Sequence, residues 1–192
     1  MQILPDKPID KARHQNRPLC LLAYTIRDEQ PTDVDAIAAA TEDAFLDSSI
    51  PGERNEHLLA AALRQAGGLA VSLVADLEGE IIGHIAFSPI TINDHASTWY
   101  SLAPVSVVRR YQLKGIGTAL INQGLDRLRS LGAGGCILVG HPSYYPRFGF
   151  VHPGTLLFEG VPAEAFFGMS YTDTWPQGRV REHPGLEQFY DW

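Results

Sequence analysis

A glycine-rich turn that opens a helical pattern has the residue types best suited to chemistry in this sequence. Gly115 and Gly117 precede apolar residues that recur at three- and four-residue steps, which predicts a helix. The first N–H groups of a helix have no partner inside it, and the helix dipole adds partial positive charge there. Glycine has no Cβ to keep a bulky anion away, and Arg109, Arg110 and Lys114 add positive charge. The turn predicts a phosphate or pyrophosphate site, although a lone Gly-x-Gly is more often only a helix start.

The elements on either side of this turn predict a βαβ unit. A short apolar run with β-branched residues occupies 102–108, the helical pattern covers 116–131, and an unbroken apolar run follows at 136–139. An unbroken apolar run is typical of a central strand that is covered on both faces. A strand, a crossover helix and a second strand form a right-handed unit with parallel strands.

Two common phosphate-binding motifs are absent from the sequence. A Walker loop needs the pattern G-x-x-x-x-G-K-[ST], and no such string occurs. A dinucleotide fingerprint needs G-x-G-x-x-G or a final alanine, but Leu120 stands at that final position. It also needs an acidic residue after the second strand, where this chain has Val139-Gly140-His141. The phosphate site therefore belongs to another class.

The motif that fits is Q-x-x-G-x-G, present over Gln112–Gly117 and preceded five residues earlier by Val107. After the second strand comes the ending Tyr-x-x-x-Gly-Phe, from Tyr145 to Phe150. With the βαβ spacing, these motifs resemble the GNAT superfamily of acetyl-CoA-dependent N-acetyltransferases over roughly residues 24–171. The string LVGHPSYY, which ends at Tyr145, is most similar to a bacterial branch of predicted acetyltransferases. The resemblance implies a GNAT-like single α/β domain, with a mixed central β-sheet, a splayed parallel strand pair and flanking helices.

The same resemblance implies how acetyl-CoA would be held as co-substrate, with no metal. The glycine loop would bind the pyrophosphate, and the backbone of the preceding strand would meet the pantetheine arm and the acetyl carbonyl. The resemblance implies that a backbone amide near Val105 or Val107 polarises that carbonyl, and which amide serves is open because Pro104 has no N–H. The implied cofactor-binding residues are Val105, Ser106, Val107, Gln112, Leu113, Lys114, Gly115, Ile116, Gly117 and Thr118.

One tyrosine is expected to act on the leaving group. Tyr145 stands four residues before Gly149, where the family places a tyrosine that can protonate the thiolate. A role in packing is an equal alternative for this side chain. The neighbouring Tyr144 would take the catalytic role if the turn is shifted by one residue.

Several residues are candidates for the group that removes the proton from the amine. The candidates are His84 in a predicted strand, Glu56 and Glu53 at a predicted helix start, and His141 after the second strand of the βαβ unit. A histidine in a strand is more often structural, and glutamates at a helix start complement the helix dipole. A chain of water molecules without a single base is a further alternative.

The remaining pattern divides the chain into three parts: a loosely ordered extension over 1–18, an acetyltransferase domain over 19–171, and a tail over 172–192. Aromatic residues near its end predict that the tail docks on the domain or on a partner subunit. The other predicted helices cover 34–45 and 53–66. The other predicted strands cover 19–28, 69–77, 81–92, 98–107, 156–158 and 166–171, with an irregularity at Pro89 and a hairpin turn at Glu78-Gly79.

Composition narrows the function classes. The chain has 192 residues, is 45% hydrophobic and carries a net charge of -7, which predicts one globular domain and argues against nucleic-acid binding. No apolar run approaches the length of a membrane span, and the polar, proline-broken start is not a signal peptide. The two cysteines, Cys20 and Cys136, are expected to be free thiols in the cytoplasm.

The sequence thus predicts an enzyme that transfers the acetyl group of acetyl-CoA to a primary amine by direct attack in a ternary complex. The acceptor is a small molecule or a peptide, and a homodimer is compatible with the aromatic tail. Two alternatives stay open. One is a non-catalytic acyl-CoA-binding or sensor module, and the other is a protein acetyltransferase that acts on a lysine or an N-terminus.

Overall fold

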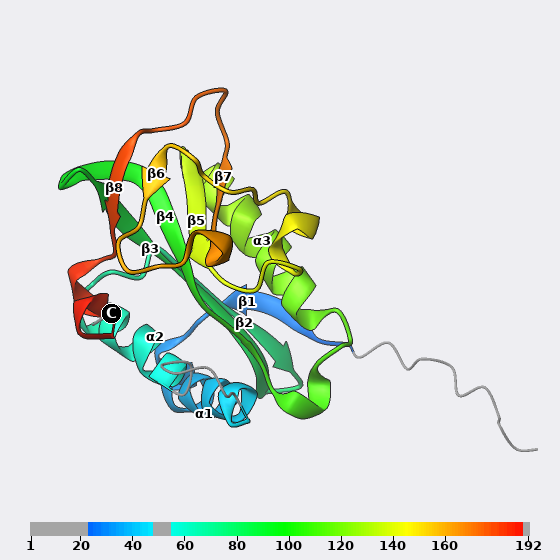
Figure 1. Ribbon diagram of the computed structural model, residues 1–192. Coiled ribbons are helices and arrows are strands. Elements are labelled where there is room, and N and C mark those ends of the chain that lie inside the picture. Colours follow the sequence, from blue (N-terminus) through cyan, green and yellow to red (C-terminus); the bar gives the residue numbers. More distant parts are fainter. Residues whose placement is uncertain (1–22, 48–54, 190–192) are drawn as a thin grey trace, which may run out of the picture.

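The computed structural model describes residues 23–47 and 55–189, and these form a mixed β-sheet with helices on both faces (Figure 1). The main strand order is β1-β2-β3-β4-β5-β7, and β8 joins the sheet at the far end of β3. Neighbouring strands are antiparallel except for β4 with β5 and the short pair β6 with β8. The strands are β1 Thr25–Asp28, β2 Val71–Leu77, β3 Glu80–Ile92, β4 His95–Val107, β5 Gly135–Val139, β6 Leu156–Leu157, β7 Phe166–Ser170 and β8 Gly178–Arg181.

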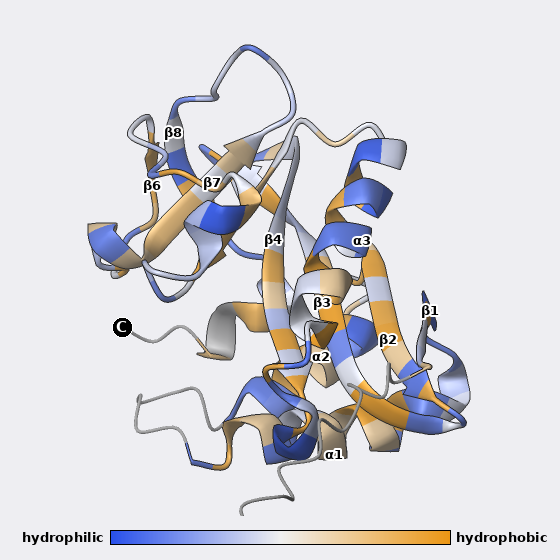
Figure 2. Cartoon of the chain, turned by 90° about the vertical axis from the view of Figure 1, so that its right-hand side faces the viewer, coloured by the Kyte–Doolittle hydropathy of each residue, from blue (hydrophilic) through white to orange (hydrophobic). Residues whose placement is uncertain are grey.

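The α-helices are α1 Val34–Phe45, α2 Glu56–Gln65 and α3 Ile116–Ser130. Figure 1 shows α3 on one side of the sheet, with α1 and α2 on the other. Figure 2 shows hydrophobic residues concentrated on β2, β3 and β4, whereas α1 and α3 alternate between hydrophobic and hydrophilic positions. The apolar stripe predicted for α3 is buried at Ile116, Leu120, Ile121, Leu125 and Leu128. The short 3-10 helices are η1 Pro31–Asp33, η3 Arg109–Tyr111, η4 Tyr145–Phe148, η5 Ala163–Ala165 and η6 Pro184–Phe189.

The parallel pair β4 and β5 separates soon after it begins. The two strands are paired only at Trp99↔Gly135, Tyr100↔Cys136 and Ser101↔Ile137. Beyond Ser101, β4 continues to Val107 paired with β3 alone, while β5 is paired with β7. The predicted splayed pair and the α/β fold class are therefore confirmed.

An extra residue on β4 lies where the strands part. Phe87 of β3 faces Leu102 of β4, and Ile85 faces Val105, so two steps on β3 match three steps on β4. This is a β-bulge, which bends a strand and often lies next to a functional site. The predicted irregularity at Pro89 is also present, since the β3–β4 register shifts again between Pro89 and Thr91.

The tail contains a strand that the sequence pattern did not predict, because the predicted elements end at residue 171. β8 pairs with β3 through Arg181↔Thr91 and Val180↔Ile92, and the side chain of Val180 is buried. After β8 the chain returns beside α2 (Figure 1), where Leu186 is buried in one apolar cluster with Leu59 and Leu63 of that helix.

Several sequence-based expectations fall outside the described residues: the extension over 1–18, Cys20, Glu53 and the last three residues of the tail. The second helix, predicted from residue 53, is described from Glu56. Within the two described ranges, no helix is long and apolar enough to cross a membrane.

Candidate active site

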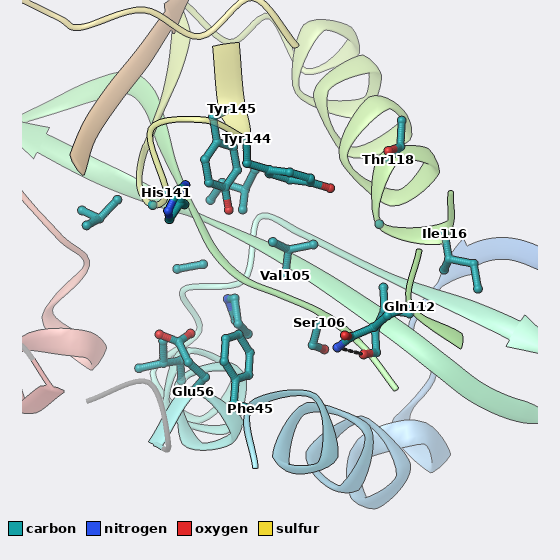
Figure 3. A pocket seen from close by; sticks show the side chains of 18 of the residues that line it. Phe45, Glu56, Val105, Ser106, Gln112, Ile116, Thr118, His141, Tyr144 and Tyr145 are labelled. Atoms are coloured by element: carbon teal, nitrogen blue, oxygen red, sulfur yellow. Dashed lines mark hydrogen bonds between the residues drawn. The ribbon is translucent and has the colours of Figure 1, made fainter. Parts of the chain in front are cut away.

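A cavity of about 940 Å³ opens where β4 and β5 separate. In Figure 3, Tyr144, Tyr145 and His141 lie on one side of it, Phe45 and Glu56 lie on the opposite side, and Val105 lies between them. Clefts beside such a strand opening are favourable ligand sites because backbone groups of the parted strands face the space. Of the predicted cofactor-binding residues, those that line the cavity are Val105, Ser106, Val107, Gln112, Leu113, Gly115, Ile116, Gly117 and Thr118.

The start of α3 presents unpaired amides to this cavity. The first helical bond runs from the N–H of Ala119 to the carbonyl of Gly115, at 3.0 Å. The N–H groups of Ile116, Gly117 and Thr118 therefore precede the helical ladder and have no acceptor inside the helix. Gly115 has a φ of 85°, the left-handed region in which glycine is favoured, so the turn needs glycine there. This is the geometry of a backbone anion site.

The loop before α3 is tied to β4 by one side chain. Gln112 donates from Nε2 to the carbonyl oxygen of Val107 at 3.0 Å, as Figure 3 shows. This bond links the glycine turn to the strand end and so fixes the distance between the helix start and the open edge of β4. Lys114, in contrast, is not among the cavity-lining residues, and its Nζ donates to the carbonyl of Arg110 at 2.7 Å.

The arginines beside the turn do not supply the free positive charge that the sequence pattern predicts. Arg109 forms ion pairs with Asp43 and Asp47, at 3.3 and 2.5 Å. Arg110 forms an ion pair with Glu80. Neither arginine lines the cavity. An anion at this turn would therefore depend chiefly on the backbone amides.

The open edge of β4 presents its amides to the cavity at alternate residues. Val108 donates its N–H to the carbonyl of Ile82 on β3 at 3.0 Å. Successive residues of a strand point their backbone groups in opposite directions, so the N–H groups of Val107 and Val105 point away from β3. They face the side from which β5 has departed. The side chain of Ser106 points to the opposite helices, where its Oγ lies 2.9 Å from Oγ1 of Thr41 on α1.

Two tyrosines lie opposite the start of α3. The hydroxyl of Tyr144 would be 3.5 Å from a Cβ placed on Gly117, so this ring faces the helix start across a narrow part of the cavity (Figure 3). The ring of Tyr145 lies against Gly140, where a Cβ would come within 2.1 Å of it. Tyr145 also packs edge-on against Tyr144 and Phe150, with ring centroids 5.1 and 6.0 Å apart. Both tyrosines line the cavity.

The fold brings only some of the candidate proton acceptors to the cavity. Glu56 and His141 line the cavity, whereas His84 does not. His84 is fully buried on β3, with Nε2 2.8 Å from Oγ of Ser72, and burial lowers the pKa of its imidazole although Glu29 opposes this. It therefore belongs to a buried polar cluster with Ser72 and Glu29, away from the cavity.

A carboxylate that sequence reasoning missed lies in the cavity wall. Glu182 follows β8 directly, lines the cavity and is only 8% exposed. Its Oε1 accepts a hydrogen bond of 2.6 Å from Oγ of Ser101, the last β4 residue paired with β5. Its Oε2 has no hydrogen-bond partner among the described residues. Burial raises the pKa of Glu182 to about 7, against the opposing effect of the Ser101 bond. The sequence offered no signal for this, because the position depends on how the tail folds back.

The described part of the chain holds no group of three or more His, Cys, Asp or Glu side chains that could bind a metal ion. The cavity lining combines the start of α3, the carboxylates Glu56 and Glu182, and apolar side chains.

Residues 34–150 match the acetyltransferase (GNAT) family. Over 126 residues the chain is 37% identical to the uncharacterized N-acetyltransferase YhbS of Escherichia coli (strain K12). The aligned region covers 65% of this chain and 72% of that protein. The fold is similar to the crystal structure of a GNAT family acetyltransferase from Brucella melitensis in complex with acetyl-CoA, with a TM-score of 0.77, 38% identity, and coverage of 86% of this chain and 99% of that one. It is also similar to E. coli YhbS in complex with CoA, with a TM-score of 0.78, 31% identity, and coverage of 86% and 92%.

Proposed function

The chain belongs to the GNAT family of acetyltransferases, and from this membership we propose that it transfers the acetyl group of acetyl-CoA to a primary amine by direct attack in a ternary complex. The observation that carries the proposal is the cavity at the parting of β4 and β5, which has an amide-lined helix start at one end and a buried carboxylate at the other. These two ends suit a phosphate-bearing donor and a basic acceptor.

The residues at the helix start fit the donor. The free amides of Ile116, Gly117 and Thr118 would bind the pyrophosphate, and the amides of Val105 and Val107 would run along the pantetheine arm. A Cβ on Gly117 would point into the cavity, within 3.6 Å of Val107, so glycine leaves room for a ligand here. Acetyl-CoA supplies an activated thioester, and this chain supplies the amides that stabilise negative charge on its carbonyl oxygen.

Tyr145 is assigned as the proton donor to the leaving thiolate, with Tyr144 as the alternative. Both side chains line the cavity beside the helix start. The phenol of a tyrosine has an ordinary pKa near 10, so a proton can pass to a nascent thiolate without a large perturbation. Tyr145 is also packed against Phe150 and Phe167, which supports its alternative role as a structural residue.

The acceptor is assigned as an amine that carries an apolar group, on a small molecule or a peptide. The cavity wall on the α1, α2 and tail side combines two carboxylates with apolar side chains: Phe45, Glu56, Leu59, Glu182 and Phe189. A protein lysine or an N-terminus would meet the same chemistry and is the second candidate. A cytoplasmic location goes with the proposal, since the buried Cys136 is a free thiol.

The test is an amine screen with acetyl-CoA, in which thiol release and acetylated product are both measured. We expect calorimetry to show acetyl-CoA binding and at least one basic amine to be acetylated. Binding without acetylation of any amine, peptide or protein lysine in the panel would favour the acyl-CoA-sensor alternative. Absence of acetyl-CoA binding by the folded protein would overturn the proposal altogether.

A further inference from the structure

We propose that Glu182 binds the protonated amine of the acceptor and is the general base that removes its proton. This inference rests on the proposed acetyl transfer and assigns a residue and a substrate charge to it. The candidates from the sequence were His84, Glu56, Glu53 and His141, and the tail was not among them.

The first support is the state of the carboxylate. Glu182 is buried, with one oxygen bonded to Ser101 and the other without a partner among the described residues. A buried carboxylate with an unpaired oxygen costs free energy, because it has lost water and gained no compensating donor. Glu182 lines the cavity, so a ligand can supply that donor. A protonated amine offers both the hydrogen-bond donor and the positive charge that the carboxylate lacks.

The second support is that the charged and titratable groups around Glu182 do not compensate it. The Ser101 hydroxyl of β4 donates to it, and the Cys136 thiol of β5 feels its charge. Elsewhere around the cavity, α2 contributes another carboxylate, Glu56, and the segment after β5 contributes His141, Tyr144 and Tyr145.

The arginine in the cavity lining and the arginine that precedes Glu182 in the sequence are engaged elsewhere. The Arg147 guanidinium lies 4.5 Å from the centre of the Tyr144 ring, and Arg181 pairs with Asp94 at 2.8 Å. No ion pair to Glu182 occurs among the described side chains.

The third support is position relative to the amides of β4. Ser101, which holds Glu182, is the last residue of β4 that pairs with β5. The cavity-facing amides of Val105 and Val107 lie just beyond, along the same strand. Leu102 packs in the core beside α3, so the preceding side chain, Ser101, points to the opposite face of the sheet. An amine held by Glu182 would thus approach the thioester from the face opposite the helix that binds the pyrophosphate.

The carboxylate is also suited to proton transfer near neutral pH. Burial raises its pKa to about 7, and a general base is most effective when its pKa is close to the working pH. His84, by comparison, is fully buried and does not line the cavity. Glu56 also lines the cavity, on the α2 side.

Glu182 begins the proposed acetyl transfer by accepting a proton. The ammonium R–NH3+ gives one proton to Oε2 of Glu182, and the lone pair of the resulting amine forms the C–N bond to the thioester carbon. The carbonyl π electrons move to oxygen and return as the C–S bond breaks, and the electron pair of that bond leaves with sulfur as a thiolate. The second nitrogen proton passes to the thiolate through the tyrosine hydroxyl. Glu182 then releases its proton to solvent, which gives the amide, CoA-SH and one proton.

The experiment compares the full-length wild type with Glu182→Gln, using acetyl-CoA and the best amine from the screen. Gln keeps the side-chain shape and an oxygen for Ser101, but it cannot accept the proton. We expect kcat/KM to fall by about 10²–10⁴, while the dissociation constant of acetyl-CoA changes less than about twofold. Glu42→Gln, an exposed change on α1, is the matched control and should behave as wild type.

The pH profile separates a base from a structural residue. In wild type, kcat/KM should rise through an ionisation near 7, and the variant should lack this limb. The difference in kcat/KM between wild type and the variant should shrink as the pH approaches the amine pKa of about 10, because free amine then needs no base. Wild-type-like turnover and an unchanged acidic limb in Glu182→Gln would overturn the assignment and leave acetyl transfer standing. A wild type that acetylates no amine would overturn the proposed function, and the assignment with it.

Discussion

The hydroxyl oxygen of Tyr144 lies 3.5 Å from the position that a Cβ on Gly117 would occupy. The second residue of α3 and the segment after β5 thus face each other across a space only one side chain wide. Val107 borders the same position from β4, at 3.6 Å. Three elements that are distant in sequence therefore meet around the amides assigned to the pyrophosphate.

The first prediction is that Gly117→Glu abolishes acetyl-CoA binding and leaves the fold intact. The Cβ itself would make only ordinary contacts, so the helix should form, but the rest of the side chain would enter the cavity and place a carboxylate at the anion site. Calorimetry should show a loss of affinity of at least about 100-fold, since a buried like charge costs several kcal/mol.

Asn122→Glu is the matched control for this variant, because it adds the same charge at an exposed position of the same helix. It should retain the wild-type affinity and melting temperature. Unchanged acetyl-CoA affinity in folded Gly117→Glu would contradict the assignment of the α3 start to the pyrophosphate.

The second prediction concerns the leaving group. Tyr145→Phe keeps the ring that packs on Gly140 and Phe150 and removes only the hydroxyl. If the phenol protonates the thiolate, kcat should fall at least about tenfold while the affinity for acetyl-CoA stays nearly unchanged.

Tyr144→Phe is the paired variant, since Tyr144 is the neighbouring ring in the same cavity. Loss of activity in Tyr144→Phe alone would move the role by one residue. Full activity in both variants would make both tyrosines packing residues and leave water as the proton donor.

Much of this fold could be predicted from the sequence because its patterns are long and local. The apolar stripe of α3 spans four turns, and its predicted residues are buried except Leu131, which follows the last helical residue and is exposed. The hairpin turn at Glu78-Gly79 is present, with positive φ at both residues, as its composition indicates. The tight turn expected at Gly115 is present, with a positive φ at this glycine, and Gly115 lines the cavity.

The rest depended on contacts between distant segments. β8 is the four-residue segment GRVR with a single buried apolar side chain, too short for an alternation to be recognised. Its partners on β3 lie about 90 residues earlier in the chain, so no local pattern could bring Glu182 beside Ser101. The prediction that Arg109 supplies free positive charge at the glycine turn was wrong for the same reason. Arg109 forms ion pairs with Asp43 and Asp47, which lie on and just after α1.

The third prediction is that reducing agent does not change thermal stability. Cys136 is a buried free thiol on β5, and burial raises its pKa well above the ordinary value, so it is poorly reactive. The melting temperature should be the same with and without dithiothreitol. A drop of several degrees on reduction would reveal a disulfide and would contradict the expected free thiols.

The last prediction links Glu182 to the pH dependence of stability. Its pKa in the folded protein is about 7, above the ordinary 4.5 that it should regain on unfolding. Between these values the unfolded chain releases a proton that the folded chain keeps, so the stability of the wild type falls as the pH rises from 4.5 to 7. Gln has no such proton. The free energy of unfolding of Glu182→Gln relative to wild type should therefore increase by about 2–3 kcal/mol between pH 5 and pH 8.

Urea unfolding of both proteins at the two pH values measures this difference directly, and other titrating groups cancel because both proteins share them. Acetyl-CoA is left out of these samples so that ligand binding adds nothing. Glu42→Gln should show the same relative stability at both pH values, because that side chain is exposed. If the difference in free energy of unfolding between Glu182→Gln and wild type is the same at both pH values, Glu182 titrates as an ordinary carboxylate. The description of Glu182 as buried and unpaired would then be wrong.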